Sequence, residues 1–186
     1  VDSPFVLSNN VTVYPGVTLT IEPGVKVGFG ESFWMIVNGR IVANGEENKM
    51  ITFTSSKLMP LEGDWGTILI SGTQPSSFEY CVIEYGTNGI AVKTSSLSLQ
   101  DCVVRSNSAN GIMIDGGNVV VKNDEIANNA MSGIFIDGGS QITVQNNDIS
   151  SNGEGISLTG RVSGYIDVEQ NNVFLNGQSG ITLDAD

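Results

Sequence analysis

Three ionisable residues recur at a fixed spacing that would allow their side chains to act together. Lys93, Asp115 and Asp137 each lie three residues after the isoleucine of a Gly-Ile dipeptide, and consecutive members are 22 residues apart. If segments of that length stack on one another, the three side chains form one column. Carboxylate oxygens are preferred ligands of Ca²⁺, and two adjacent carboxylates favour a bound cation because their charges repel. We therefore take Asp115 and Asp137 as a candidate Ca²⁺ site, with Lys93 beside it.

The same column offers little to catalysis. Two carboxylates can serve as acid and base in glycoside hydrolysis, but both aspartates here precede Gly-Gly, a sequence typical of turns. The chain contains no histidine, which excludes a Ser-His-Asp triad. We favour a turn role for the two aspartates and assign no catalytic residue.

A second column, two residues earlier in each segment, is largely apolar. Its members are Leu69, Ala91, Met113, Phe135, Ser157 and Thr182. Alternation predicts that these side chains face outward, and a soluble domain seldom leaves such an apolar stripe bare. We interpret Leu69, Met113 and Phe135, together with Lys93, as candidate contacts for a carbohydrate or a partner protein. The alternative is that another part of a longer protein covers the stripe.

The two cysteines, Cys81 and Cys102, are 21 residues apart and occupy the same position in neighbouring segments. Stacked strands lie about 4.8 Å apart, which is within reach of a disulfide. The same spacing is equally compatible with two free thiols. Two cysteines without a histidine do not make a metal site.

A repeat in the second half of the chain predicts how these residues are positioned relative to one another. Gly-Ile recurs at residues 89, 111, 133, 155 and 180, so the spacings are 22, 22, 22 and 25 residues. Each dipeptide opens a run of alternating apolar and polar residues, which is typical of β-strands, and no window shows helical spacing. A fixed period of this length indicates a solenoid. With three short strands per repeat, the sequence predicts an all-β fold: a single-stranded right-handed parallel β-helix of about eight coils.

Alternation also predicts which side chains fill the core. The residues expected to point inward are Ile90, Val92, Ile112, Ile114, Ile134, Ile136, Ile156, Leu158, Ile181 and Leu183. Asn107, Asn129 and Asn152 recur at one bend, where asparagine tolerates a left-handed backbone and its amide can bond the neighbouring coils. We expect these asparagines to be structural.

One stretch carries a family resemblance. The pattern Asn147-Asp148-Ile149-Ser150-Ser151-Asn152, followed by Gly155-Ile156, resembles the parallel β-helix repeat of the pectin-lyase-like superfamily. The N-terminal segments VTVYPGVTLTIEPGVKVGFG, VNGRIVANG, ITFTSS and GDWGTILI look like the opening coils of bacterial and archaeal surface proteins. The resemblance implies the fold for nearly the whole chain and a secreted or cell-surface location. Lyases of this kind hold Ca²⁺ with acidic residues and use Lys or Arg as base, but the scaffold also hosts proteins without enzymatic activity.

Length and charge limit the remaining possibilities. We expect residues 1–186 to form one β-helix domain, with irregular N-terminal coils in 1–64 and regular coils of about 22 residues in 65–186. Residues 1–10 are expected to be a lead-in without a strand, and Ser55–Asp64 a protruding loop. Twenty acidic and eight basic residues give a net charge of −12, which argues against nucleic-acid binding. The chain has no apolar run long enough for membrane insertion, and its opening without Met suggests a fragment of a longer protein.

The function expected from these features is a non-catalytic domain of a secreted or cell-surface protein. It would serve as a structural spacer or as a module that binds a carbohydrate or a cell-envelope protein, with no cofactor apart from the candidate Ca²⁺. A homo-oligomer or contact with neighbouring domains of the same chain is compatible with the open ends of a solenoid. The alternative is a polysaccharide-active enzyme: a lyase, a glycoside hydrolase or an epimerase.

Overall fold

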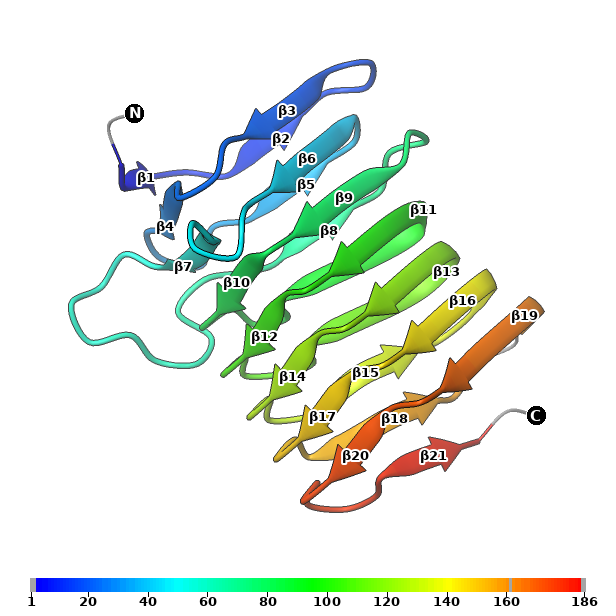
Figure 1. Cartoon of the computed structure of the whole chain (residues 1–186). Helices are drawn as coiled ribbons and strands as arrows, with labels where there is room; N and C mark the ends of the chain where they lie inside the picture. The colour runs from blue at the N-terminus through cyan, green and yellow to red at the C-terminus, as the bar shows by residue number, and fades with distance from the viewer. Residues whose placement is uncertain (1–2, 161, 185–186) are drawn as a thin grey trace.

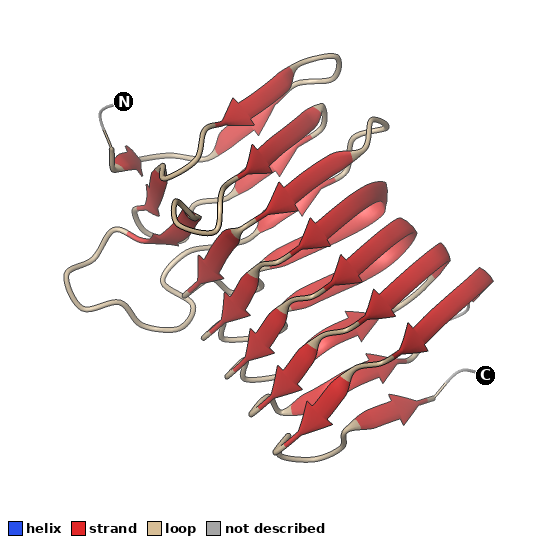
Figure 2. Cartoon of the chain, viewed as in Figure 1, coloured by secondary structure: helices blue, strands red, loops and turns tan. Residues whose placement is uncertain are grey.

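The computed structural model describes residues 3–160 and 162–184, and within them it is all-β, with 21 strands and no helix (Figure 2). The strands wind into a right-handed parallel solenoid of about eight turns, as the repeat predicted. The two ends of the chain lie at opposite ends of the resulting rod (Figure 1).

Each full turn contributes a strand to each of three faces, which we name face A, face B and face C. Face A consists of β2 (Val11–Val13), β5 (Met35–Val37), β8 (Ile68–Ile70), the first part of β11 (Ile90–Gln100) and of β13 (Ile112–Lys122), β15 (Ser132–Ile136), β18 (Glu154–Leu158) and β21 (Ile181–Leu183). Face B consists of β3 (Thr18–Ile21), β6 (Arg40–Asn44), β9 (Ser76–Glu79), the later part of β11 and of β13, β16 (Gly139–Gln145) and β19 (Val162–Glu169). Face C is a separate sheet of β1 (Phe5–Leu7), β4 (Lys26–Phe29), β7 (Ile51–Ser55), β10 (Cys81–Glu84), β12 (Val103–Arg105), β14 (Glu125–Ala127), β17 (Asp148–Ser150) and β20 (Asn172–Phe174).

The core is a set of aliphatic rows that run along the rod. One row on face A joins register partners in successive turns: Ile68, Ile90, Ile112, Ile134 and Ile156. All five are buried, and burying an isoleucine side chain contributes about 1.5–3 kcal/mol. The inward prediction is therefore confirmed for this row.

The prediction is wrong for Ile181 and Leu183 at the end of the described chain. Their side chains are 52% and 72% exposed, and Leu158 in the turn before is only half-buried. Alternation gives the direction of a side chain, whereas burial also requires a turn on the other side, and none of the described residues supplies one.

The lead-in is also more ordered than its sequence suggests. Phe5–Leu7 forms β1, which pairs with β4 in parallel register, Phe5 opposite Val27 and Leu7 opposite Phe29. The expectation of a lead-in without a strand was wrong because the edge of β4 offers main-chain partners that outweigh weak local propensity.

The two tryptophans support the irregular coils. Trp65 is fully buried and stacks on Phe29, with ring centroids 4.0 Å apart and planes 9° apart. Its indole Nε1 donates a hydrogen bond to the carbonyl oxygen of Glu84 at 2.9 Å. Trp34 packs over Gly66, where an added Cβ would lie 2.3 Å from the ring, so only glycine fits beneath it.

The asparagine ladder forms at the bend between face C and face A. Asn107 Nδ2 donates to Asn129 Oδ1 at 2.8 Å, and Asn129 Nδ2 donates to Asn152 Oδ1 at 2.9 Å. Asn152 Nδ2 continues to Asn176 Oδ1 at 3.1 Å. The main-chain N–H groups of Asn107, Asn129 and Asn152 donate to the same oxygens. The structural role expected for these residues is confirmed.

Replacing Asn129 by Ala should destabilise the solenoid by about 2–5 kcal/mol. The change removes the oxygen that accepts hydrogen bonds from the N–H and from the Nδ2 of Asn107, and each such loss at a buried group costs about 1–3 kcal/mol. Urea unfolding monitored by circular dichroism measures the effect. The matched control is Asn118→Ala, an exposed position on β13 that should change stability by less than about 0.5 kcal/mol. Equal effects at the two positions would contradict the role given to the ladder.

Candidate functional site

The structure brings the ionisable column together but adds no further ligand to it. Lys93 and Asp115 are register partners, and the N–H of Asp137 donates to the carbonyl of Ile114 at 2.8 Å, which places Asp137 one turn beyond Asp115. Lys93 and Asp115 do not form an ion pair: the described pairs are Lys49–Glu46, Lys57–Asp64 and Arg105–Glu84. In the described part of the chain, no group of three His, Cys, Asp or Glu residues could hold a metal ion. The Ca²⁺ site stays a prediction.

The corner that follows Asp115 depends on its two glycines, and the turn role of the Asp115 and Asp137 side chains stays a prediction. Gly116 and Gly117 follow Asp115 with φ angles of +93° and +95°, a region that residues with a Cβ seldom adopt. A Cβ on Gly117 would also lie 1.8 Å from the carbonyl oxygen of Ser95. Gly-Gly therefore turns the chain from face A to face B, and Asp115 lies at this corner.

The apolar column lies on face A in the expected register. Leu69, Ala91, Met113, Phe135, Ser157 and Thr182 are successive partners across five strand pairs. Leu69, Met113 and Phe135 are half-buried, and Ala91 and Ser157 are buried. The column is thus less exposed than alternation suggested, because side chains on adjacent turns cover one another. Its role as a contact surface stays a prediction.

The feature that departs most from the repeat is the segment between β7 and β8. Residues 56–64 extend away from the body of the solenoid (Figure 1), as the sequence predicted for a protruding loop. The buried carboxylate of Asp64 holds this segment, which we call the braced loop. It accepts hydrogen bonds from Ser55 Oγ at 2.7 Å, Lys57 Nζ at 2.6 Å and the N–H of Leu61 at 2.9 Å. The N–H of Gly63 donates to the carbonyl of Gly86 at 3.1 Å, which ties the loop to the next turn.

The ionisation of Asp64 matters to this bracing. Burial alone would raise the pKa of the Asp64 carboxyl, but the bonds from Lys57, Leu61 and Ser55 together lower it below its usual 3.8. The bond to Asp64 raises the pKa of Lys57. Because the pKa of Asp64 is lowered in the folded state, its ionised carboxylate stabilises the fold fully above about pH 4. This stabilisation is lost as the pH falls through the pKa that Asp64 has in the folded protein.

The braced loop presents its apolar side chains to solvent. Leu58, Met59 and Leu61 are 102%, 83% and 69% exposed, which makes them among the most exposed large apolar residues that the structure describes. An exposed apolar group at the tip of a held loop is an unfavourable arrangement in water alone. Such groups mark a contact surface when they are gathered on one element.

The loop overhangs face C and leaves a hollow on each side. One hollow has a volume of about 430 Å³ and is lined by Pro4, Val6, Lys26, Gly28, Thr54, Ser55, Ser56, Lys57, Leu58, Pro60, Glu84 and Tyr85. The other has a volume of about 480 Å³ and is lined by Pro60, Leu61, Glu62, Tyr85 and Ser106. Pro60 and Tyr85 contribute to both hollows, so the loop and the tyrosine divide one continuous surface.

The floor of this surface is polar and ordered. Glu84, which is half-buried on β10, accepts hydrogen bonds from Thr54 Oγ1 at 3.0 Å and from Arg105 Nε at 3.0 Å. Arg105 Nη2 also lies 2.9 Å from Glu84 Oε2, so the guanidinium holds the carboxylate through two nitrogens. Charged and hydroxyl groups held in this way beside the hollow suit a ligand with hydroxyl groups.

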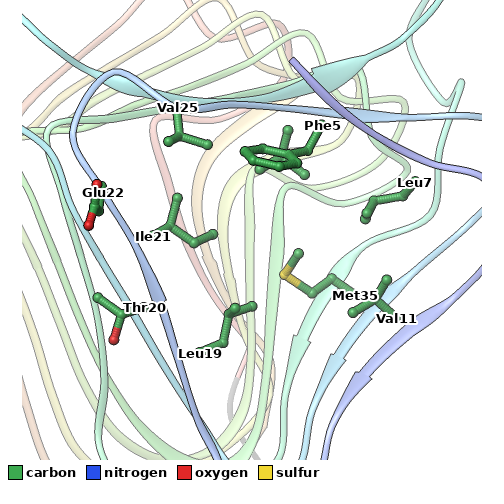
Figure 3. Close-up of a pocket in the computed structure, with 10 residues that line it drawn as sticks. Phe5, Leu7, Val11, Leu19, Thr20, Ile21, Glu22, Val25 and Met35 are labelled. Carbon is green, nitrogen blue, oxygen red and sulfur yellow. The ribbon is translucent and has the colours of Figure 1, made fainter. Parts of the chain in front are cut away.

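An apolar hollow of about 470 Å³ occupies the first turns of the described core (Figure 3). It is lined by Phe5, Leu7, Val11, Leu19, Thr20, Ile21, Glu22, Val25, Val27 and Met35. Leu19, Ile21 and Met35 belong to β3 and β5, and Phe5 and Leu7 come from β1 (Figure 3). This lining suits a non-polar surface and lacks the polar groups found beneath the braced loop.

The two cysteines are buried free thiols in register on β10 and at the start of the next turn. The N–H of Cys81 donates to Cys102 Sγ at 3.3 Å, and Cys81 Sγ donates to the carbonyl of Ala43 at 3.1 Å. Burial raises the pKa of the Cys102 thiol well above its usual value. Of the two alternatives that the spacing allowed, the structure has the thiols.

These parallel faces, wound from one chain around an aliphatic core, define a parallel β-helix. Residues 66–186 match the family model described as the right handed beta helix region, and the chain belongs to that family. Residues 2–91 match a model described as the pectate-lyase like beta helix domain. Comparisons with the curated proteins and with the solved structures find no match for this chain. The described residues contain no helix long and apolar enough to cross a membrane.

Sequence reasoning found the braced loop but not the groups that surround it. The length of the bend at Ser55–Asp64 was a visible signal, and so was the presence of both Lys57 and Asp64 within it. Glu84, Arg105 and Thr54 gave no comparable signal, since they come from three different turns and meet only through the register of face C.

The substitution Asp64→Asn should release the braced loop without unfolding the solenoid. It removes a charged partner from the bonds to Lys57, Ser55 and Leu61, and a hydrogen bond to a charged group contributes about 1.5–3 kcal/mol. We expect limited proteolysis between residues 57 and 62 to become at least about tenfold faster, corresponding to about 1.4 kcal/mol. Mass spectrometry of the fragments measures the rate.

The matched control for this experiment is Glu62→Gln, an exposed carboxylate on the same loop. It should leave the cleavage rate unchanged. Equal cleavage in both variants, or none in either, would show that Asp64 does not hold the loop.

Proposed function

We propose that this protein is a non-catalytic β-helix domain of a secreted or cell-surface protein that contacts a partner through the braced loop and the face C surface beneath it. The observation that carries the proposal is the bracing of the loop by Asp64 together with the exposure of Leu58, Met59 and Leu61. A pre-organised loop loses little conformational entropy on binding, and large apolar side chains are effective anchors in a complementary pocket.

The stacked turns support a second part of the same role, that of a rigid spacer. Adjacent turns are joined by continuous parallel ladders along both sheets, so the loop is held at a fixed place on the rod. A rod of this kind separates its contact surface from whatever adjoins its ends.

The chemistry of the surface suggests the class of partner. The apolar tip suits a protein of the cell envelope. Glu84 and Tyr85, which line the hollow beside the loop, suit the hydroxyl groups and ring faces of a carbohydrate, and Arg105 holds the Glu84 carboxylate. The face A column of Leu69, Met113 and Phe135, with Lys93, is a separate candidate contact surface. Bound Ca²⁺ at Asp115 and Asp137 would act only on this second surface.

The double variant Leu58→Ser with Met59→Ser should reduce partner binding at least about tenfold, or about 1.4 kcal/mol, because it removes the apolar anchors. The measurement is a screen of the wild-type domain against glycans and envelope proteins, followed by titration of each hit with the variant. Met131→Ser, at a residue 56% exposed on another bend, is the control and should bind as the wild type does.

The same screen separates the two surfaces. If binding is lost in Phe135→Ala or in the presence of a chelator, while the loop variant still binds, the partner contacts face A. That result would contradict the proposal.

The second candidate function is a polysaccharide-active enzyme, a lyase, hydrolase or epimerase. It is favoured by the match of residues 2–91 to the pectate-lyase-like model and by the column of Lys93, Asp115 and Asp137. Incubation with acidic and neutral polysaccharides tests it, and shortened or unsaturated products that disappear in Lys93→Ala would favour this function over the first.

A further inference from the structure

A second ladder runs along the bend between face B and face C, and its members are of three chemical kinds: two thiols, one carboxyl group and two amides. They are Cys81, Cys102, Asp124, Asn147 and Asn171. From Cys102 onward, each side chain accepts a hydrogen bond from the main-chain N–H of the preceding member. Asp124 Oδ1 accepts from the N–H of Cys102 at 2.7 Å, and Asn147 Oδ1 accepts from the N–H of Asp124 at 2.9 Å.

The two asparagines use their second side-chain atom to satisfy a buried carbonyl. Asn147 Nδ2 donates to the carbonyl of Val121 at 3.0 Å, and Asn171 Nδ2 donates to the carbonyl of Val144 at 2.7 Å. Val121 and Val144 are register partners, and the partner of Val121 in the preceding turn is Leu99. The repeat therefore directs the second side-chain atom of Asp124 towards the carbonyl of Leu99.

Asp124 differs from the two asparagines because an ionised carboxylate has no hydrogen to donate to the carbonyl. The residue is 2% exposed, and its Oδ2 has no hydrogen-bond partner. An ionised carboxylate would place its Oδ2 against the carbonyl oxygen of Leu99, two acceptors with no proton between them, and burial of the side chain disfavours the charge. A protonated carboxyl group has one acceptor and one donor, which is the arrangement that an asparagine amide offers in the neighbouring turns.

We propose that Asp124 is a neutral carboxylic acid in the folded protein, that its Oδ2–H donates to the carbonyl of Leu99 in place of the ladder amide, and that this makes the solenoid lose stability as the pH rises from the acidic to the neutral range. The proton comes from solvent when the chain folds and returns to solvent when the group ionises. No other bond is made or broken.

The surrounding charges agree with this assignment. Lys122 and Glu125 flank Asp124 on its own turn, Asp101 and the Cys102 thiol lie on the preceding turn, and Asp148 adjoins Asn147 on the following turn. Burial raises the pKa of Asp124 to about 8, main-chain hydrogen bonds partly oppose this, and the charge of Asp101 adds to it. Burial raises the pKa of the Cys102 thiol well above its usual value, so this group stays neutral and adds no negative charge beside Asp124.

The raised pKa of Asp124 in the folded state decides how stability changes with pH. Below about pH 4 both the folded and the unfolded chain hold the proton, and the contribution to stability is complete. Between about pH 4 and pH 8 only the folded chain holds it, so the unfolding equilibrium constant rises about tenfold per pH unit from this group. Above the pKa of Asp124 in the folded protein, this contribution to the free energy of unfolding is lost.

The test compares urea unfolding between pH 5 and pH 9 for the wild type, Asp124→Asn and Asn147→Asp. Asp124→Asn restores the amide, so we expect a shallower loss of stability with pH and an unfolding constant at least about tenfold lower at pH 8. Asn147→Asp places a second carboxyl group in the same ladder and should steepen the loss. Wild-type slopes in both variants would overturn the proposal.

Nuclear magnetic resonance of the wild type gives a second measurement that does not depend on a variant folding. The carboxyl carbon of Asp124 should titrate near pH 8, well above the ordinary range of an aspartate side chain. Titration of Asp124 near pH 4 would show that the group is ionised in the fold, and would overturn the proposal whatever the unfolding data show.

Discussion

The structure depends on the need of each bend to satisfy its main-chain N–H groups. In the strands the neighbouring turn supplies the partners, but at a bend the pairing is interrupted, and a side chain of the next turn has to provide the acceptor. Asn129 does this for Asn107, and Asn152 does it for Asn129. Because a side chain that can accept a hydrogen bond must return at the same bend, the length of a turn is fixed within narrow limits. The period of the sequence and the aliphatic rows of the core both follow from this requirement.

Much of the fold could be predicted because the signals are local and repeated. Alternation in segments such as Ile112–Ile114 gives strands, and recurrence at one spacing gives the stacking of turns. Burial of a particular side chain is different, since it depends on the turn beyond it, and so Ile181 is exposed although its pattern matches that of Ile156. The pairing of β1 with β4 was missed for a related reason, because a free edge elsewhere in the chain decides it.

The candidate site was harder to predict than the fold. Glu84 and Arg105 are ordinary charged residues in the sequence, and they become a pair only when the register of face C sets them side by side. The second ladder was not recognised as one feature because it passes from two thiols to a carboxyl group and then to amides at one position, so that no single residue type runs along it. Its members from Cys102 onward accept the same kind of hydrogen bond from the main chain although they are different residue types. A search for repeated residue types does not find such a group.

The braced loop also shows how this architecture tolerates insertion. After the loop the chain returns to its ladder without a shift, since Ile68 pairs with Met35 on one side and with Ile90 on the other. Extra length at a bend is thus absorbed locally, and neither the core nor the neighbouring turns have to repack. A lineage built on this rod could replace one surface loop by another in a single step, and so acquire a new partner while keeping the same stable interior.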